Sequence, residues 1–261
     1  MKEKLVYNFA DIQRSIEFLE KKKEPYRLTL TNYTTRIESK YYDRHYLAKK
    51  QNPKVFSAFN KIKKDLTEWS ANEKPVVRPE EMVYFNHNFR SSGTIKKIFA
   101  TDIKSAYATV LLNDGFISIE TYNYISELDK EDRLACVGML AAKKDFFYFD
   151  GHELNYAVED KSEFTPYFHY CVKRTAEIMS GAIKAINKEA ALFYWVDCIF
   201  CWIDQQAELR DYLDSLKYNY TQSEYFRLSI EEMQDHFFAS YYKKDNPGPD
   251  DNPSTVVPSA A

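Results

Sequence analysis

Glycine is scarce in this sequence, with 6 residues in a chain of 261. Phosphate-binding loops of the glycine-rich kind need several glycines close together, because only then can the backbone amides approach a phosphate closely. A glycine-rich nucleotide-binding loop is therefore excluded. If the protein binds nucleotides, it must hold them by other means.

Cysteine is also sparse, and its spacing shows no disulfide framework. The four cysteines are Cys136, Cys171, Cys198 and Cys201. The last two form a C-x-x-C pair inside a predicted strand, where an odd offset directs the two side chains to opposite faces. A zinc site would need two further ligands nearby. We therefore expect reduced thiols packed in a core.

Long apolar runs and an excess of positive charge are missing as well. No apolar run approaches 18 residues and no signal peptide is visible, so we expect a soluble cytoplasmic protein. The formal net charge is −3 and the pI is near 6.0. This balance argues against strong autonomous binding to nucleic acid, although it leaves room for a local basic groove.

Hydrophobic residues make up 44% of the chain, and aromatic residues 16%, with 21 Tyr and 18 Phe. A chain of this length and composition can bury a substantial core, as one large or two small domains. Periodicity predicts elements of both types. We expect helices over residues 9–24, 55–69, 105–112, 119–128, 130–144, 164–188 and 208–216, and strands over 26–38, 94–101 and 236–244.

Two further predictions come from turn and breaker residues. Asp150-Gly151 separates two alternating runs, which predicts a hairpin over residues 146–159. The tail from residue 245 to 261 contains four of the nine prolines and no periodicity, so we expect it to be disordered.

Two aspartates each lie at or near the end of an apolar, strand-forming run. Asp102 follows Ile98-Phe99-Ala100-Thr101, and Asp197 lies within Leu192–Ile203. Two carboxylates on neighbouring strands are what a site for two divalent metal ions requires, because such ions prefer oxygen ligands. An alternative is that each aspartate simply caps the element that follows its strand, which needs no metal.

The two segments resemble conserved motifs of family B DNA polymerases. Asp102–Tyr107 is similar to the first catalytic motif, an Asp followed after two residues by Ser-Leu-Tyr-Pro. Phe193–Phe200 is similar to the third motif, Tyr-Gly-Asp-Thr-Asp-Ser with apolar flanks. Ala108, Tyr194 and Trp195 replace the proline, the glycine and the first aspartate of these motifs.

The resemblance implies an α+β fold: a polymerase-like palm with an antiparallel sheet packed by helices, a small helical fingers-like insertion and an N-terminal α+β extension. The corresponding domains would be an extension over residues 1–93, a palm-like core over 94–244 with the insertion at about 116–160, and a disordered tail over 245–261. No proofreading exonuclease region is recognisable in the first 93 residues.

The resemblance also implies site residues and ligands. Asp102 and Asp197 would be catalytic, and with Ile103 they would hold Mg²⁺ or Mn²⁺. Residues that would bind the nucleotide are Ile103, Lys104, Ser105, Ala106, Tyr107, Arg133 and Lys144. Backbone amides after Asp102 would hold triphosphate oxygens, and Tyr107 would select the sugar. On the predicted helix over residues 130–144, Arg133 and Lys144 would share a face and bind phosphates.

Three interpretations follow. The first is a divergent or minimal DNA polymerase, a nucleotidyltransferase that uses a DNA primer-template and deoxynucleoside triphosphates, with or without a partner subunit that supplies a thumb or processivity. The second is a catalytically degenerate palm-fold accessory protein of a phage or mobile element that binds nucleic acid, because Val137, Leu140 and Ala141 replace the Asn and Tyr-Gly of the family's fingers. The third is that the resemblance is accidental and the chain is a structural or interaction protein, in which Asp102 and Asp197 would lie far apart.

Overall fold

The computed structural model describes residues 3–6, 9–31, 34–47, 52–69, 74–87, 92–232, 237–243 and 254–256. The chain forms two compact units, Met1–Glu68 with Tyr124–Phe168, and Trp69–Asn123 with His169–Ala261. This division differs from the predicted boundaries after residues 93 and 244 and from the predicted insertion at about 116–160, which remain predictions.

The first unit is built around a six-stranded sheet with the order β1-β4-β3-β2-β7-β8. Neighbouring strands are antiparallel except β1 and β4, which are parallel. The strands are β1 (Glu3–Val6), β2 (Tyr26–Leu30), β3 (Thr34–Ser39), β4 (Asp43–Leu47), β7 (Lys143–Phe149) and β8 (Leu154–Lys161). Residues 26–38 form strands as predicted, as the antiparallel pair β2 and β3, and the predicted hairpin around Asp150-Gly151 is confirmed.

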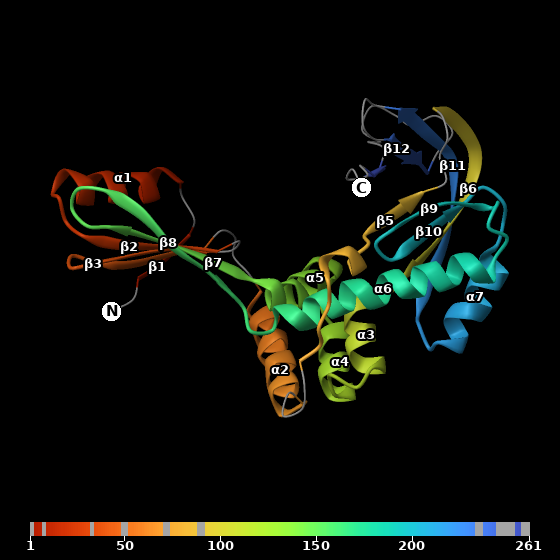
Figure 1. The fold of residues 1–261 in the computed structure, drawn as a ribbon, viewed down its shortest axis with the longest axis horizontal. Helices are drawn as coiled ribbons and strands as arrows, with labels where there is room; N and C mark the ends of the chain where they lie inside the picture. Colours follow the sequence, from red (N-terminus) through yellow and green to blue (C-terminus); the bar gives the residue numbers. More distant parts are fainter. Residues whose placement is uncertain are drawn as a thin grey trace. The chain divides into compact units, whose positions relative to one another are not determined.

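Helix α1 (Phe9–Lys21) lies along one face of this sheet (Figure 1). Ile12 and Leu19 occur at helical spacing and are buried in one cluster with Tyr26, Leu28 and Ile37 of the sheet. The helical periodicity of the sequence thus identifies the face that forms the core. Helix α2 (Pro53–Trp69) follows the same rule, with Val55, Ala58, Ile62 and Leu66 buried.

The predicted helix over residues 130–144 is wrong in its second half. Helix α5 (Lys130–Gly138) ends at a glycine, a poor helix former, and a short 3-10 turn, η2 (Met139–Ala141), follows it. Lys144 lies in β7, where it pairs with Asp160 of β8. Strand pairing therefore extends the hairpin into the predicted helix, and Arg133 and Lys144 do not share a helix face.

Gly151 in the turn of this hairpin should not tolerate a side chain. Its φ is +101°, and a Cβ atom would lie 2.8 Å from the backbone oxygen of Lys23. We expect Gly151→Ala to lower the free energy of unfolding by about 2 kcal/mol, measured by urea denaturation. Gly93→Ala is the control, since nothing lies within 4 Å of its Cβ position. Equal stability of the two variants would contradict this prediction.

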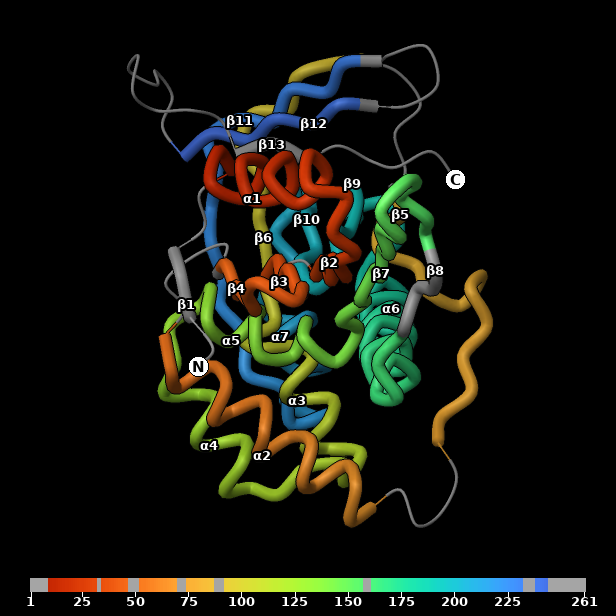
Figure 2. The backbone as a smooth tube through the Cα atoms, turned by 90° about the vertical axis from the view of Figure 1, so that its left-hand side faces the viewer, coloured from red at the N-terminus to blue at the C-terminus, as the bar shows by residue number. Residues whose placement is uncertain are grey.

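The second unit contains a seven-stranded sheet with the order β13-β12-β11-β6-β10-β9-β5. All its neighbouring pairs are antiparallel. The strands are β5 (Phe85–His87), β6 (Gly93–Ile103), β9 (Ala191–Trp195), β10 (Cys198–Cys201), β11 (Tyr220–Glu232), β12 (Phe237–Tyr242) and β13 (Ser254–Val256). Strand β6, which confirms the strand predicted over residues 94–101, lies in the centre of the sheet between β11 and β10 (Figure 2).

Helices α6 (Thr165–Ala185) and α7 (Gln206–Ser215) lie along one face of this sheet (Figure 1). Tyr194 of β9 hydrogen-bonds Ser180 of α6 on that face. The other face carries an aromatic and aliphatic cluster that includes Ile98, Phe193 and Phe200. The remaining helices are α3 (Ala106–Asn113), α4 (Ile119–Ser126) and the 3-10 turn η1 (Pro79–Glu81).

The predicted α+β class, with antiparallel sheets packed by helices, is confirmed. Within the described ranges, no helix combines the length and the apolar character needed to cross a bilayer. Of the tail predicted to be disordered, residues 245–261, the structure describes only Ser254–Val256, which pair with β12 as β13. The rest of that tail lies outside the described residues.

Candidate active site

Asp102 is the penultimate residue of the central strand β6. It lies opposite Cys198 of β10 on one side and opposite Thr221 of β11 on the other. The preceding residues of the strand, Phe99 to Thr101, are buried, whereas Asp102 is half-buried. The apolar strand therefore holds the carboxyl group at the margin of the core, where it can reach solvent.

Asp197 lies in the two-residue turn between β9 and β10, with Trp195 and Cys198 paired on either side of the turn. Its carbonyl oxygen accepts a hydrogen bond of 2.9 Å from the Ile103 backbone amide, the residue after Asp102. Both aspartates therefore lie at the same end of two adjacent strands. This arrangement contradicts the interpretation in which they are far apart.

Val196, the other residue of this turn, has a φ of +53°. A positive φ is a genuine outlier for a β-branched residue, because its Cβ branches crowd the backbone. The Val196 amide donates a hydrogen bond of 2.7 Å to the Tyr84 carbonyl oxygen, which anchors the turn on the segment before β5. The turn that carries Asp197 is thus held in a strained conformation by its neighbours.

Relief of this strain should stabilise the protein. We expect Val196→Gly to raise the free energy of unfolding by about 0.5–1 kcal/mol, because glycine adopts a positive φ without a steric cost. The greater conformational entropy of glycine in the unfolded chain offsets only part of this stabilisation. Val196→Ala keeps a Cβ atom and is the control. Chemical denaturation measures both variants. A glycine variant no more stable than the alanine variant would show that the turn is not strained.

Tyr107, in the first turn of α3, lies within electrostatic reach of Asp197. Burial raises the pKa of its phenol well above the usual value, and the charges of Tyr84 and Asp197 add to this effect. The phenol is therefore neutral at physiological pH and can donate a hydrogen bond. Its backbone oxygen accepts a hydrogen bond of 3.7 Å from the Cys171 thiol of α6, which ties α3 to the long helix.

Asp102 also influences the aromatic cluster on the sheet. Burial raises the pKa of Tyr225 in β11 to about 12, and the charges of Tyr241, Cys198 and Asp102 contribute. In the same cluster, the rings of Phe193 and Phe200 stack with their centroids 4.4 Å apart. The candidate site thus lies at the edge of a tightly packed aromatic layer.

The backbone amides that follow Asp102 are used in two different ways. Ile103 donates its amide hydrogen to Asp197 and Lys104 donates its own to the Asn219 carbonyl at 2.8 Å, so both amides are engaged within the sheet. Ser105, with a φ of 52°, turns the chain into α3. Ala106 and Tyr107 precede the first intrahelical hydrogen bond, from the Thr109 amide to the Ser105 carbonyl. Phosphate binding by amides is therefore an expectation for the start of α3, not for Ile103 and Lys104.

Two predicted phosphate-binding residues, Arg133 and Lys144, belong to the other unit. The Arg133 guanidinium donates to the Leu128 carbonyl oxygen, where it caps the chain after α4. Lys144 is exposed on β7. Their role toward a nucleotide stays a prediction.

Sequence reasoning missed three residues around the aspartates. Tyr84 binds the Val196 amide, Asn219 binds the Lys104 amide and Thr221 faces Asp102 across the ladder. None of them belongs to a motif, because each reaches the site through strand pairing with a distant segment. Alternation of polar and aromatic residues around Tyr84 was the only local signal of a strand there.

The donor chemistry of the site is limited to a few oxygens. In the part of the chain that the structure describes, no group of three or more His, Cys, Asp or Glu side chains could hold a metal ion. Mg²⁺, however, is commonly bound in proteins by only one or two carboxylates together with substrate phosphates. Two half-buried carboxylates at the same end of two adjacent strands fit that mode of binding.

Comparisons with known proteins place few constraints on this site. No protein-family model matches the chain, and no curated protein matches it either. Among solved structures, the chain is similar to Phi29 DNA polymerase in complex with primer-template DNA and incoming nucleotide substrates, with 10% sequence identity and a TM-score of 0.45 over 80% of this chain and 60% of that one.

A second structure of Phi29 DNA polymerase, in complex with single-stranded DNA, has 10% identity and a TM-score of 0.44 over 78% of this chain and 59% of that one. The BmCPV RNA-dependent RNA polymerase at its elongation state has 11% identity and a TM-score of 0.21 over 88% of this chain and 22% of that one. The chain thus spans about three fifths of the Phi29 polymerase chains. Because the TM-scores of these three structures are below 0.5, the function of the site has to be inferred from its geometry.

Proposed function

We propose that this protein is a nucleotidyltransferase with a polymerase-like palm that adds deoxynucleotides to a DNA primer on a template. One observation carries the proposal. Asp102 and Asp197, predicted from separate motifs, lie at the same end of adjacent strands, with the Ile103 amide 2.9 Å from the Asp197 carbonyl oxygen.

Divalent metal ions, Mg²⁺ or Mn²⁺, fit the donor set. The Asp102 and Asp197 carboxylates and the Ile103 carbonyl oxygen would hold them, since hard cations prefer oxygen ligands. When bound, such ions lower the pKa of an attacking hydroxyl group and neutralise charge on a triphosphate. Both aspartates are half-buried, so ions from the solvent can reach them. When no ion is bound, their negative charges remain partly hydrated.

The chain's own residues would orient the nucleotide. The exposed Lys104 supplies a point charge for phosphate oxygens, and the first turn of α3 contributes the positive end of the helix dipole. Tyr107, neutral and beside Asp197, would contact the sugar of the incoming nucleotide. A larger or smaller side chain at this position would then change the preference between deoxyribose and ribose.

Primer extension tests this proposal. The full chain is incubated with a short primed template and four deoxynucleoside triphosphates, in Mg²⁺ and separately in Mn²⁺. We expect extension that requires the metal. Thermal denaturation with and without each ion gives a second readout, because an ion that binds only the folded state raises the melting temperature.

A second candidate function is a palm-fold accessory protein that binds nucleic acid without catalysis. The replacement of the motif's first aspartate by Trp195, and the lack of a larger acidic cluster in the described ranges, favour it. It predicts neither extension nor metal-dependent stabilisation. Stabilisation by metal without extension would instead indicate an unusual substrate or a missing partner subunit.

A further inference from the structure

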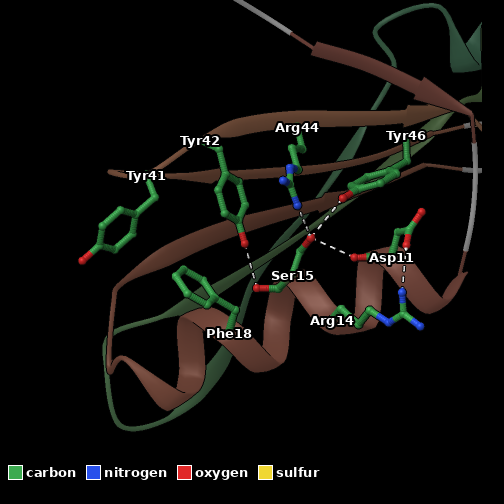
Figure 3. Close-up of a pocket in the computed structure, with 8 residues that line it drawn as sticks. All are labelled: Asp11, Arg14, Ser15, Phe18, Tyr41, Tyr42, Arg44 and Tyr46. Carbon is green, nitrogen blue, oxygen red and sulfur yellow. Dashed lines mark hydrogen bonds and ion pairs between the residues drawn. The ribbon is translucent and has the colours of Figure 1, made fainter.

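A pocket of about 620 Å³ lies in the first unit, between α1 and residues 41–46, which lead into and form most of β4 (Figure 3). This volume is in the range of sites for small ligands, roughly 300–1,000 Å³. Both aromatic rings and charged groups line it. Its lining residues are Asp11, Arg14, Ser15, Phe18, Tyr41, Tyr42, Arg44 and Tyr46.

Ser15 organises the inner wall of the pocket. Its hydroxyl donates its one hydrogen to the Asp11 carbonyl oxygen at 2.8 Å. It therefore acts as an acceptor for Arg44 Nη1 at 2.8 Å and for the Tyr46 hydroxyl at 3.0 Å, which uses both its lone pairs. The Tyr42 hydroxyl donates to the Ser15 carbonyl oxygen at 2.8 Å. The hydrogen-bonding capacity of this serine is fully used inside the protein.

These contacts hold a cation in place. The Arg44 guanidinium lies 4.4 Å from the centre of the Tyr42 ring, in addition to its hydrogen bond to Ser15. A guanidinium stays protonated at any physiological pH and offers several donors in one plane. Arg44 is thus oriented before any ligand arrives, which reduces the entropic cost of binding.

The outer rim combines exposed aromatic rings with further charges. Phe18 and Tyr41 are 45% and 53% exposed, and their ring centroids lie 5.9 Å apart. Lys40 Nζ lies 5.8 Å from the Tyr41 ring centre. The Arg14 side chain is 79% exposed, and its 3.7 Å contact with Asp11 is a solvent-exposed ion pair of the weak kind.

We propose that this pocket binds a nucleotide, with its base against Phe18 and Tyr41 and its phosphate between Arg14 and Arg44. Every base presents a π-face that stacks on aromatic side chains, and arginine pairs with phosphate in a bidentate manner. Two arginines and one carboxylate line the pocket, and Lys40 lies near the Tyr41 ring at its rim, so an anion is favoured. The nucleotide is either free or part of a single strand, and the chemistry of recognition is shared.

Binding of a fluorescent ten-residue oligo-dT to the full chain, in EDTA, tests the stacking contact. We expect Phe18→Ala and Tyr41→Ala each to weaken binding about tenfold, the typical effect of one lost base–aromatic stack. Phe9→Ala is the matched control, because Phe9 is on the same helix, is 67% exposed and does not line the pocket. We expect this control to bind as the wild type does.

The phosphate contact has its own readout. Arg14→Ala should reduce the slope of log K against log salt concentration by about 0.7, the value for one phosphate contact with a single strand. Lys21→Ala removes the same charge from the same helix outside the pocket and should leave the slope unchanged. Competition between dTMP and the labelled oligo-dT distinguishes a site for a free nucleotide from a site for a strand. If dTMP displaces oligo-dT at a concentration similar to that of unlabelled oligo-dT, the pocket is a mononucleotide site.

Two results would overturn the proposal: wild type that binds neither oligo-dT nor dTMP, or pocket variants that bind as tightly as Phe9→Ala. EDTA and an Asp197→Asn background make the outcome independent of the proposed transferase activity. If the pocket proposal is wrong, the oligo-dT titration shows it and primer extension is unaffected. If the proposed function is wrong, primer extension shows it and the titration is unaffected.

Discussion

Replacement of Asp197 or Asp102 by asparagine should lower the rate of nucleotide addition at least about a thousandfold. Asparagine keeps the shape of the side chain but removes the negative charge that a divalent ion needs. Loss of a metal ligand removes several kcal/mol of transition-state stabilisation, and about 4 kcal/mol corresponds to a factor of a thousand. Primer extension in Mg²⁺ measures the effect for each variant.

The control for this experiment is Asp211→Asn, which changes an aspartate of α7 whose side chain is 72% exposed. It should extend primers at the wild-type rate. Circular dichroism and thermal denaturation in EDTA should show that the site variants fold normally, and metal-dependent stabilisation should be lost in them. Extension at the wild-type rate by both site variants would refute the proposed catalytic role.

Phe193→Ala should destabilise the second unit by about 3–5 kcal/mol, the usual cost of truncating a buried phenylalanine. Phe193 is 1% exposed, stacks on Phe200 and lies 6.0 Å, centre to centre, from the ring of Phe85. The substitution would leave a cavity beneath the β9–β10 hairpin, which carries Asp197. Guanidinium denaturation followed by circular dichroism measures the change.

Phe226→Ala is the matched control, since Phe226 belongs to β11 of the same sheet and is 57% exposed. Its removal should change stability by less than about 0.5 kcal/mol. If Phe193→Ala also changed the free energy of unfolding by less than about 0.5 kcal/mol, the aromatic layer would not stabilise the sheet.

Local patterns predicted the parts of the fold that depend on local interactions. The helical spacing of Ile12 and Leu19 predicted α1, and Asp150-Gly151 predicted the hairpin of β7 and β8. Both patterns depend on residues that lie close together in the sequence. The same reasoning failed at Lys144, because pairing with β8 overrides the local helical pattern.

Strands that depend on distant partners were harder to see. The short strands β4 and β5 were not predicted, and neither was the long strand β11. Each is stabilised by a ladder with another segment, such as Phe85 with Trp195. Strand formation of this kind follows from packing and register more than from intrinsic preference.

Local sequence patterns are enough to predict that Asp102 and Asp197 lie at or near the ends of apolar strands and that the chain mixes helices with strands. The three-dimensional fold was needed to show that the two aspartates are neighbours, because register across β6 and β10 comes from long-range pairing. It also decided that the aromatic residues of 41–46 face α1 in a charged pocket. Contacts between segments that are distant in sequence form when the core packs. The periodicity of one segment does not indicate which other segment it will pair with.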